Sequence, residues 1–224
     1  SEESNAVYAG LFGCVGSGGK IQNVGVKDSY IGTVYNNTRY NYVGGVCGSN
    51  EGTITNCYNT GTVSDSDSVG GVCGGNAGTI TNCYNTGTVS GGNVGGVSGQ
   101  NYGTIENSYN TGKVSDGDAG GVCGVNYNGT ITNCYNTGEV SGTYAGGVCG
   151  WNKPKSTIES TIINCYNIGK VSGTKVGGVC GLNEGTITEC NNRGEVSGTS
   201  VGGVSGQNYN GTITNCYNTG TVSG

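Results

Sequence analysis

The chain has 224 residues, including 49 glycines, one proline and no histidine, and its formal net charge is −5. Glycine is about three times as frequent as its usual share of roughly 7%, but a single proline and the lack of a three-residue period exclude a collagen-like protein. The charged fraction of only 10% argues against disorder. The scarcity of Lys and Arg argues against nucleic-acid binding, and no apolar run is long enough for direct membrane insertion.

One repeated segment organises the sequence, and residues 45–64 (GVCGSNEGTITNCYNTGTVS) give a complete copy. Short β-branched runs separated by Gly and Asn turns, recurring about every 25 residues, are typical of a solenoid. We predict an all-β, parallel β-helix-like solenoid of about eight coils of about 25 residues, each with about three strands. The copies begin at Gly10, Gly45, Gly71, Gly96, Gly121, Gly147, Gly178 and Gly203.

In chain order, residues 1–44 form a lead-in and a divergent first coil, and residues 45–224 form seven stacked coils of the same solenoid domain. In each coil we expect a first strand at Val46 and Cys47, a second from Ile54 to Cys57, and a third from Val63 to Val69. No polar cap follows the last coil, although a solenoid normally protects its open edge. We therefore expect the chain to continue in a longer protein or to stack end to end on another copy.

Ten cysteines occur as two per coil in five coils, and coil 4 has Ser98 and Ser108 in both places. A bonded pair is expected to lose both cysteines together, as coil 4 has. We therefore expect a disulfide across the core of each of the five coils, which would stabilise it by about 3 kcal/mol. Disulfides in turn imply an oxidising compartment. The alternative is a ladder of small buried thiols. Cys14 and Cys216 remain, either inert or bonded to a neighbouring molecule. The expected pairs are Cys47 with Cys57, Cys73 with Cys83, Cys123 with Cys134, Cys149 with Cys165, and Cys180 with Cys190.

Three asparagine columns, starting at Asn50, Asn56 and Asn59, are expected to bond from coil to coil through stacked amides. A tyrosine column is expected to hold the register by ring stacking, and its other interpretation is a surface for a glycan or a partner fibre. Its members are Tyr58, Tyr84, Tyr109, Tyr135, Tyr166 and Tyr217.

Threonine pairs recur on one expected strand, with the two residues about 6.6 Å apart along it and about 4.8 Å between coils. Flat threonine arrays of this kind occur in ice-binding solenoids, but Glu106 and Ile163 interrupt this one. Ice or surface binding is therefore the alternative function. The pairs are Thr53 and Thr55, Thr79 and Thr81, Thr130 and Thr132, Thr186 and Thr188, and Thr212 and Thr214.

No cluster of residues predicts catalysis. Without histidine there is no Ser/His/Asp or Cys/His set, and Glu159, Glu184 and Glu189 are scattered. The acids Asp65 with Asp67 and Asp116 with Asp118 are expected to be solvated turn residues rather than calcium ligands. There is also no Cys-x-x-Cys metal spacing. We expect no enzyme activity, no cofactor and no metal site.

The motif Gly-Gly-Val-Cys-Gly-x-Asn, followed by Gly-Thr-Ile-Thr-Asn-Cys-Tyr-Asn-Thr-Gly-x-Val-Ser-Gly, resembles the GLUG repeat of bacterial extracellular proteins, over residues 10–224. The resemblance implies a secreted or surface-displayed bacterial protein, often an adhesin or a stalk, and it brings no catalytic residues. The expected function is a structural or adhesive repeat module of a surface protein or fibre. Its expected partners are another copy or further repeats, and a glycan or host-surface receptor.

Overall fold

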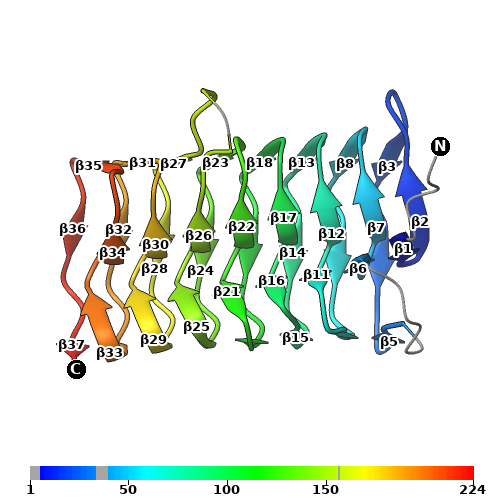
Figure 1. Cartoon of the computed structure of the whole chain (residues 1–224). Coiled ribbons are helices and arrows are strands. Elements are labelled where there is room, and N and C mark those ends of the chain that lie inside the picture. The colour runs from blue at the N-terminus through cyan, green and yellow to red at the C-terminus, as the bar shows by residue number, and fades with distance from the viewer. Residues whose placement is uncertain (1–5, 34–39, 156) are drawn as a thin grey trace.

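A computed structural model describes residues 6–33, 40–155 and 157–224. Over these ranges the chain is a parallel β-solenoid without helices, and its coils lie side by side from the N-terminal to the C-terminal end (Figure 1). Equivalent residues of successive coils are in register, as Ile54 is with Ile80 and Ile80 with Ile105. The predicted all-β solenoid is confirmed.

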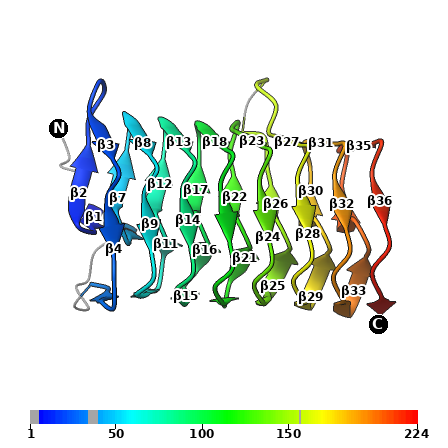
Figure 2. The same cartoon turned by 180° about the vertical axis from the view of Figure 1, so that it is seen from behind.

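Three of the four sheets take one strand from every coil, and each has eight strands. Sheet B contains β2 (Phe12–Val15), β7 (Cys47–Asn50), β12 (Cys73–Asn76), β17 (Ser98–Asn101), β22 (Cys123–Asn126), β26 (Cys149–Asn152), β30 (Cys180–Asn183) and β34 (Ser205–Asn208). Sheet C contains β3 (Lys20–Gln22), β8 (Thr53–Thr55), β13 (Thr79–Thr81), β18 (Thr104–Glu106), β23 (Thr130–Thr132), β27 (Thr161–Ile163), β31 (Thr186–Thr188) and β35 (Thr212–Thr214). Sheet D, seen from behind in Figure 2, contains β4 (Gly25–Val26), β9 (Tyr58–Asn59), β14 (Tyr84–Asn85), β19 (Tyr109–Asn110), β24 (Tyr135–Asn136), β28 (Tyr166–Asn167), β32 (Asn191–Asn192) and β36 (Tyr217–Asn218).

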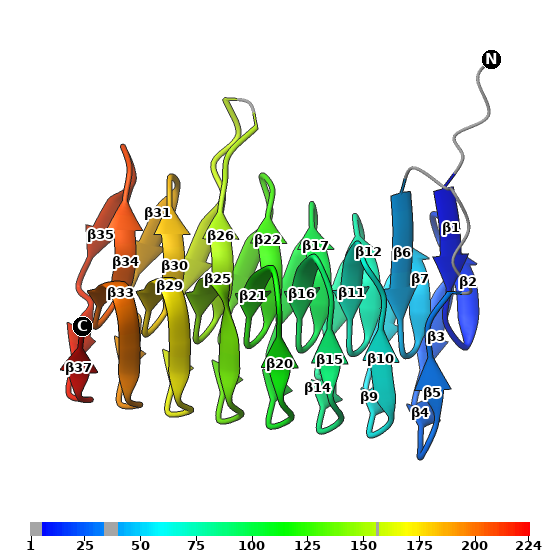
Figure 3. The ribbon, with the colours of Figure 1, turned by 60° about the horizontal axis from the view of Figure 1, so that its bottom comes forward.

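Sheet A has thirteen strands because most coils enter it twice, and Figure 3 shows both limbs. One limb begins with β5 (Tyr30–Ile31), β10 (Thr62–Ser64), β15 (Val89–Ser90) and β20 (Val114–Ser115), and the other with β1 (Ala6–Ala9), β6 (Tyr40–Gly44), β11 (Ser68–Gly70), β16 (Asn93–Gly95) and β21 (Asp118–Gly120). The limbs then join into the seven-residue strands β25 (Val140–Gly146), β29 (Val171–Gly177) and β33 (Val196–Gly202), and β37 (Val222–Ser223) is the last strand.

The expected division of a coil into three strands was too coarse. The second coil contains five short strands, β7 to β11, and Cys57 lies in the turn between β8 and β9. The reason is Asn56, whose φ of 53° is in the left-handed region and bends the chain between Ile54 and Cys57. Asparagine tolerates this conformation better than most residues, so the column that begins at Asn56 marks a corner of the solenoid.

The core consists of two adjoining stacks of buried side chains. The larger stack lies inside sheets B, C and D and contains the column of Ile54 and both cysteine columns. The smaller stack lies between the limbs of sheet A and contains the columns of Val63 and Val69. Gly71 marks the corner between sheets A and B, where a Cβ atom would lie 2.2 Å from the carbonyl oxygen of Gly96. Only glycine allows the coils to approach this closely.

The sixth coil carries the longest late insertion. Its chain leaves β26 and returns at β27, and this segment projects beyond the neighbouring coils at the top of Figure 1. Trp151 and Lys153 lie at its base, and Lys155 reaches back toward earlier coils, with Nζ 3.8 Å from the centre of the Tyr127 ring. The insertion therefore places the Lys155 ammonium over an aromatic ring on the outer surface of a regular rod.

Candidate functional site

The cysteines do not form the disulfides expected within each coil, since all twelve are free thiols. They stack between coils instead, and the Sγ atoms of Cys47 and Cys73 are 3.5 Å apart. The Cys57 thiol donates to the carbonyl oxygen of Thr55 at 3.2 Å, so its sulfur is held by the end of the preceding strand, β8. Five expected pairs are thereby corrected, namely Cys47 with Cys57, Cys73 with Cys83, Cys123 with Cys134, Cys149 with Cys165, and Cys180 with Cys190.

Ten of these thiols are buried, whereas Cys14 is exposed and Cys216 is half-buried at the last coil. Burial is the main cause that raises the pKa of Cys73, Cys149 and Cys180 well above the ordinary value. Cys14 is in register with Ser49, so it lies outside both columns. Cys216 ends one column, and its Sγ accepts from the backbone N–H of Cys190 at 3.4 Å. Only these two thiols are placed for chemistry with solvent.

Two of the three asparagine columns are buried ladders. The amide of Asn59 donates to Oδ1 of Asn85 at 2.8 Å and to the carbonyl oxygen of Gly61 at 3.0 Å. The column of Asn50 repeats this arrangement, with 2.8 Å from Asn50 to Asn76. The third column is the exposed left-handed corner at Asn56. The buried ladders clamp each coil to the next and are closed to ligands.

Five members of the tyrosine column form a continuous stack. Ring centres are 4.8–5.1 Å apart from Tyr58 to Tyr166, and neighbouring planes differ by 3–5°. Asn191 stands between Tyr166 and Tyr217 in the register, so Tyr217 lies beyond the stack. The rings cover one another's faces and present mainly their edges to solvent.

The threonine residues flank the buried isoleucine column of sheet C on both sides. The column that contains Thr53 is unbroken over the later coils, in the order Thr53, Thr79, Thr104, Thr130, Thr161, Thr186 and Thr212. The column that contains Thr55 is interrupted, as predicted, and its members are Thr55, Thr81, Glu106, Thr132, Ile163, Thr188 and Thr214. The array is one complete line beside one broken line.

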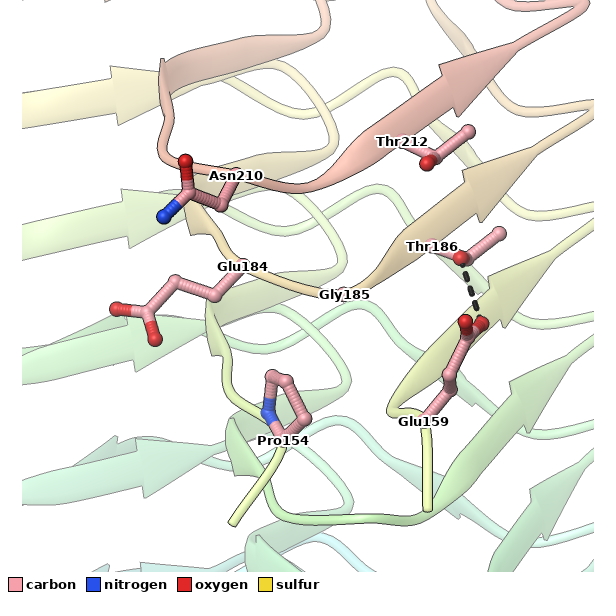
Figure 4. Close-up of a pocket in the computed structure, with 7 residues that line it drawn as sticks. All are labelled: Pro154, Glu159, Glu184, Gly185, Thr186, Asn210 and Thr212. Atoms are coloured by element: carbon pink, nitrogen blue, oxygen red, sulfur yellow. Dashed lines mark hydrogen bonds between the residues drawn. The ribbon is translucent and has the colours of Figure 1, made fainter. Parts of the chain in front are cut away.

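Figure 4 shows a small hollow beside this array, with a volume of about 160 Å³. Glu159 and Glu184 line it, but the Glu184 side chain points away from Glu159. Each carboxylate has its own partner, because Thr186 donates to Glu159 at 2.9 Å and the Trp151 indole N–H donates to Glu184 at 3.2 Å. A glycosidase requires two acids that flank one scissile bond. These two acids are not arranged in that way.

The acidic turn residues have structural partners. Asp65 accepts hydrogen bonds from the backbone N–H and the hydroxyl of Thr33 and, at 3.0 Å, from the Asn41 amide. Burial alone would raise the pKa of Asp65, but these hydrogen bonds outweigh it and lower the pKa. Asp67 accepts from the Asn41 backbone N–H at 2.9 Å. No group of three or more metal-ligating side chains occurs among the described residues.

Sequence reasoning missed a larger hollow, of about 400 Å³, on the outer side of the angle between sheets A and B. We call it the aromatic groove, and its principal lining residues are Tyr42, Asn93, Gln100, Tyr102, Tyr127 and Lys155. Tyr102 and Tyr127 stack with ring centres 5.1 Å apart. The Lys155 ammonium donates to the Tyr102 hydroxyl at 3.2 Å. The sequence signal was available, because Tyr102 and Tyr127 stand outside the repeated tyrosine position.

The fold and its ladders define the class of the protein as a repeat protein of the parallel β-solenoid type. The family model of the GLUG motif matches residues 40–64, 65–90, 90–115, 116–141 and 197–223. These matches cover more than half of the sequence, so the chain belongs to the GLUG-motif family. Comparisons with curated proteins and with solved structures gave no match. In the part of the chain that the structure describes, no helix has the length and apolar character to span a membrane.

Proposed function

We propose that the protein is a structural and adhesive repeat module of a bacterial extracellular surface protein or fibre. The observation that carries this proposal is the continuous stacking of its coils through two buried amide ladders, which makes a stiff rod with patterned side faces. The resemblance of its repeats to those of surface proteins supports the extracellular location. No metal-ligating cluster of three or more side chains occurs within the described ranges, and the two acids at the hollow in Figure 4 do not face each other, which supports a role other than catalysis.

The proposed partner at either end of the rod is another GLUG coil, from a second copy or from a longer chain. The outer faces of the first and last coils are exposed, with Leu11 at 54% and Phe12 at 41% at one end and Tyr217 at 50% and Val222 at 42% at the other. A further coil would cover these side chains and pair the open strand edges. Asn218 accepts from Asn192 at 2.7 Å, so the amide ladder reaches the last coil, and an asparagine of a further coil could extend it.

Sedimentation velocity over a range of concentrations tests the stacking. We expect assemblies that lengthen with concentration and appear as rods by electron microscopy. Asn218→Lys should abolish them, because it places a charge at the end of the buried ladder. Thr214→Lys is the matched control, because Thr214 is an exposed side-face residue of the same coil and its variant should assemble normally. A wild-type chain that stays monomeric at every concentration, and is compact in material from its source, would refute the proposal.

Ice or crystal-surface binding is the second candidate function, favoured by the unbroken column from Thr53 to Thr212. The broken neighbouring column weakens it, because Glu106 replaces a threonine in the middle of the array. The test is thermal hysteresis at millimolar protein, with Thr130→Lys as the inactivating variant. A freezing point that follows solute concentration alone would dismiss this candidate.

A further inference from the structure

The aromatic groove exists because one coil lacks the side chains that its neighbours carry. Gly75 is in register with Gln100, and the next coil has Val125 at this position. Two residues after Gly75, the third coil has Ala77 where the fourth coil has Tyr102. The missing side chains leave a recess on the outer side of the third coil, and the Tyr42 ring leans into it. A Cβ atom on Gly75 would lie only 2.8 Å from this ring.

The recess is bounded by aromatic residues from both directions along the rod. Tyr42 comes from the N-terminal side, where its ring also stacks on Tyr8 at 5.6 Å. Tyr102 and Tyr127 come from the C-terminal side. Tyr42 is in register with Ser68, and Ser68 with Asn93, so the groove extends over two coil steps, or about 10 Å. The groove therefore has aromatic rings at both ends of its length.

Hydrogen-bonding groups lie between the rings and are held in place. The Gln100 amide donates to the Ser68 hydroxyl at 2.8 Å, and its oxygen accepts from Tyr102 at 3.0 Å. Asn93 and Asp67 also line the groove. Burial, with Tyr102 as the next cause, raises the pKa of Tyr127 to about 12, so its hydroxyl stays neutral and can both donate and accept.

The charge of the groove is balanced. Lys155 is its cation, and the ammonium already contacts the Tyr102 hydroxyl and lies over the Tyr127 ring. Asp67 is its acid, with one oxygen bonded to the Asn41 backbone. A groove lined by one engaged lysine and one aspartate does not favour an anionic ligand, which would require unopposed cations. The volume of about 400 Å³ falls within the roughly 300–1,000 Å³ of small-ligand sites.

We propose that the aromatic groove binds a short segment of a neutral glycan. Apolar sugar ring faces lie against Tyr42 and Tyr102, because C–H groups are attracted to the negative face of an aromatic ring. Sugar hydroxyls hydrogen-bond to Asn93, Gln100 and Asp67, which together offer donors and acceptors. This inference rests on the proposed adhesive role and gives it a site and a ligand class, but it does not depend on end-to-end stacking.

Isothermal titration calorimetry on the full chain tests the inference with four neutral probes, namely cellotetraose, xylotetraose, maltotetraose and N-acetylated chitotetraose. We expect at least one of them to bind with a dissociation constant near or below about 1 mM. The double variant Tyr102→Ala/Tyr127→Ala should weaken this binding by at least about tenfold, since it removes the Tyr102 ring that contacts the sugar and the Tyr127 ring that supports it. Gly75→Gln should also weaken it, because it introduces the residue of the next coil and displaces Tyr42 from the recess.

Tyr109→Ala is the matched control, because Tyr109 belongs to an equally stacked column on sheet D, away from the groove. Its affinity for the probe should equal that of the wild type. Circular dichroism should show that every variant keeps the solenoid, and Tyr102→Phe, which retains the ring, should keep most of the affinity even if the double alanine variant unfolds.

The inference is overturned if none of the four probes binds at about 10 mM. It is also overturned if binding is found only for heparin or a proline-rich peptide, or if Tyr109→Ala loses as much affinity as the groove variants. Sedimentation is measured on the same preparations. If no glycan binds while rods still assemble, the glycan site is refuted and the structural role stands. If monomers bind a probe, the glycan site stands and end-to-end stacking is refuted.

Discussion

The buried amide ladder of sheet D is the feature whose removal should cost the most stability. Asn110 lies in the middle of the rod and is fully buried. Its amide donates to Oδ1 of Asn136 and to the carbonyl oxygen of Gly112, both at 2.8 Å. Its oxygen accepts from the Asn85 amide at 2.8 Å and from the Gly112 backbone N–H at 3.2 Å. Asn110→Ala therefore removes four hydrogen bonds, two of which join its coil to the coils on either side.

Each of these hydrogen bonds contributes a net 0.5–1.5 kcal/mol or so, and the loss leaves buried polar groups without one partner. The four together amount to about 4 kcal/mol, before the cavity left by the missing atoms is counted. Domains have total stabilities of about 5–15 kcal/mol. We therefore expect Asn110→Ala to lower the denaturant midpoint sharply, or to uncouple the two halves of the rod.

Urea unfolding followed by circular dichroism measures the change, with Asn107→Gly as the control. Asn107 precedes Asn110 in the same coil but is exposed, with a φ of 49°, and glycine preserves that backbone conformation. The control should change the free energy of unfolding by less than about 0.5 kcal/mol. Asn110→Asp should be worse than Asn110→Ala at neutral pH, because it buries a charge that cannot donate to Asn136. If both Asn110 variants unfold within 1 kcal/mol or so of the wild type, the ladder does not hold the coils together and the reasoning is wrong.

Three further predictions concern the corner at Glu189, the half-buried carboxyl of Asp118 and the thiols. Glu189→Asn should stabilise the protein by about 1 kcal/mol in urea unfolding, because Glu189 has a φ of 55° where other coils have asparagine; an unchanged midpoint would count against this. Burial raises the pKa of Asp118 to about 6 from 3.8, with nearby Lys153 opposing the shift, so folding gains stability as the pH falls from about 6 to about 4. Asp118→Asn should accordingly stabilise at pH 8 by about 1 kcal/mol after allowance for solvent screening, and not at pH 3.5; an equal effect at both values would contradict the charge argument. A thiol reagent should modify Cys14 and more slowly Cys216 in the native protein, with the remaining thiols reacting only after unfolding, and rapid native labelling of further cysteines would disprove the buried columns.

The repeat alone was sufficient to predict the solenoid, its register and the position of the ladders. This is because identical residues one period apart must stack when parallel strands pair in register, as Tyr84 does with Tyr58 and Tyr109. The bends were not predictable in the same way. The backbone conformation of Asn56 depends on the two strands it joins, so periodicity could not distinguish a corner asparagine from the buried Asn59 three residues later.

The aromatic groove could not be found from the repeat because it is made of departures from the repeat. Gly75 provides the space, Tyr42 comes from the segment before the second coil, and Lys155 comes from the insertion of the sixth coil. Their sequence separation gives no sign that they meet. A regular solenoid repeats the same surface in every coil. A specific site therefore arises where the side chains of several adjacent coils depart from the repeat.

The cysteines show how a sequence pattern can have a different physical cause from the one first inferred. Ser98 donates to the carbonyl oxygen of Gln100 at 2.8 Å, and Cys73 donates in the same way to Gly75 at 3.1 Å. The other column behaves alike, because Ser108 donates to Glu106 at 2.8 Å and Cys83 to Thr81 at 3.3 Å.

From the third coil on, each of these positions holds a small side chain that donates to the carbonyl two residues away, and serine and cysteine both do so without a covalent partner. The last coil supports this reasoning, since it has Ser205 in one column and Cys216 in the other, each with its own carbonyl acceptor, at 2.9 Å and 3.2 Å. A coil with one member of the expected pair still forms all four sheets. The joint replacement in coil 4 is accordingly two independent exchanges of one hydrogen-bond donor for another, and the cohesion of the rod lies in its ladders rather than in bonds across each coil.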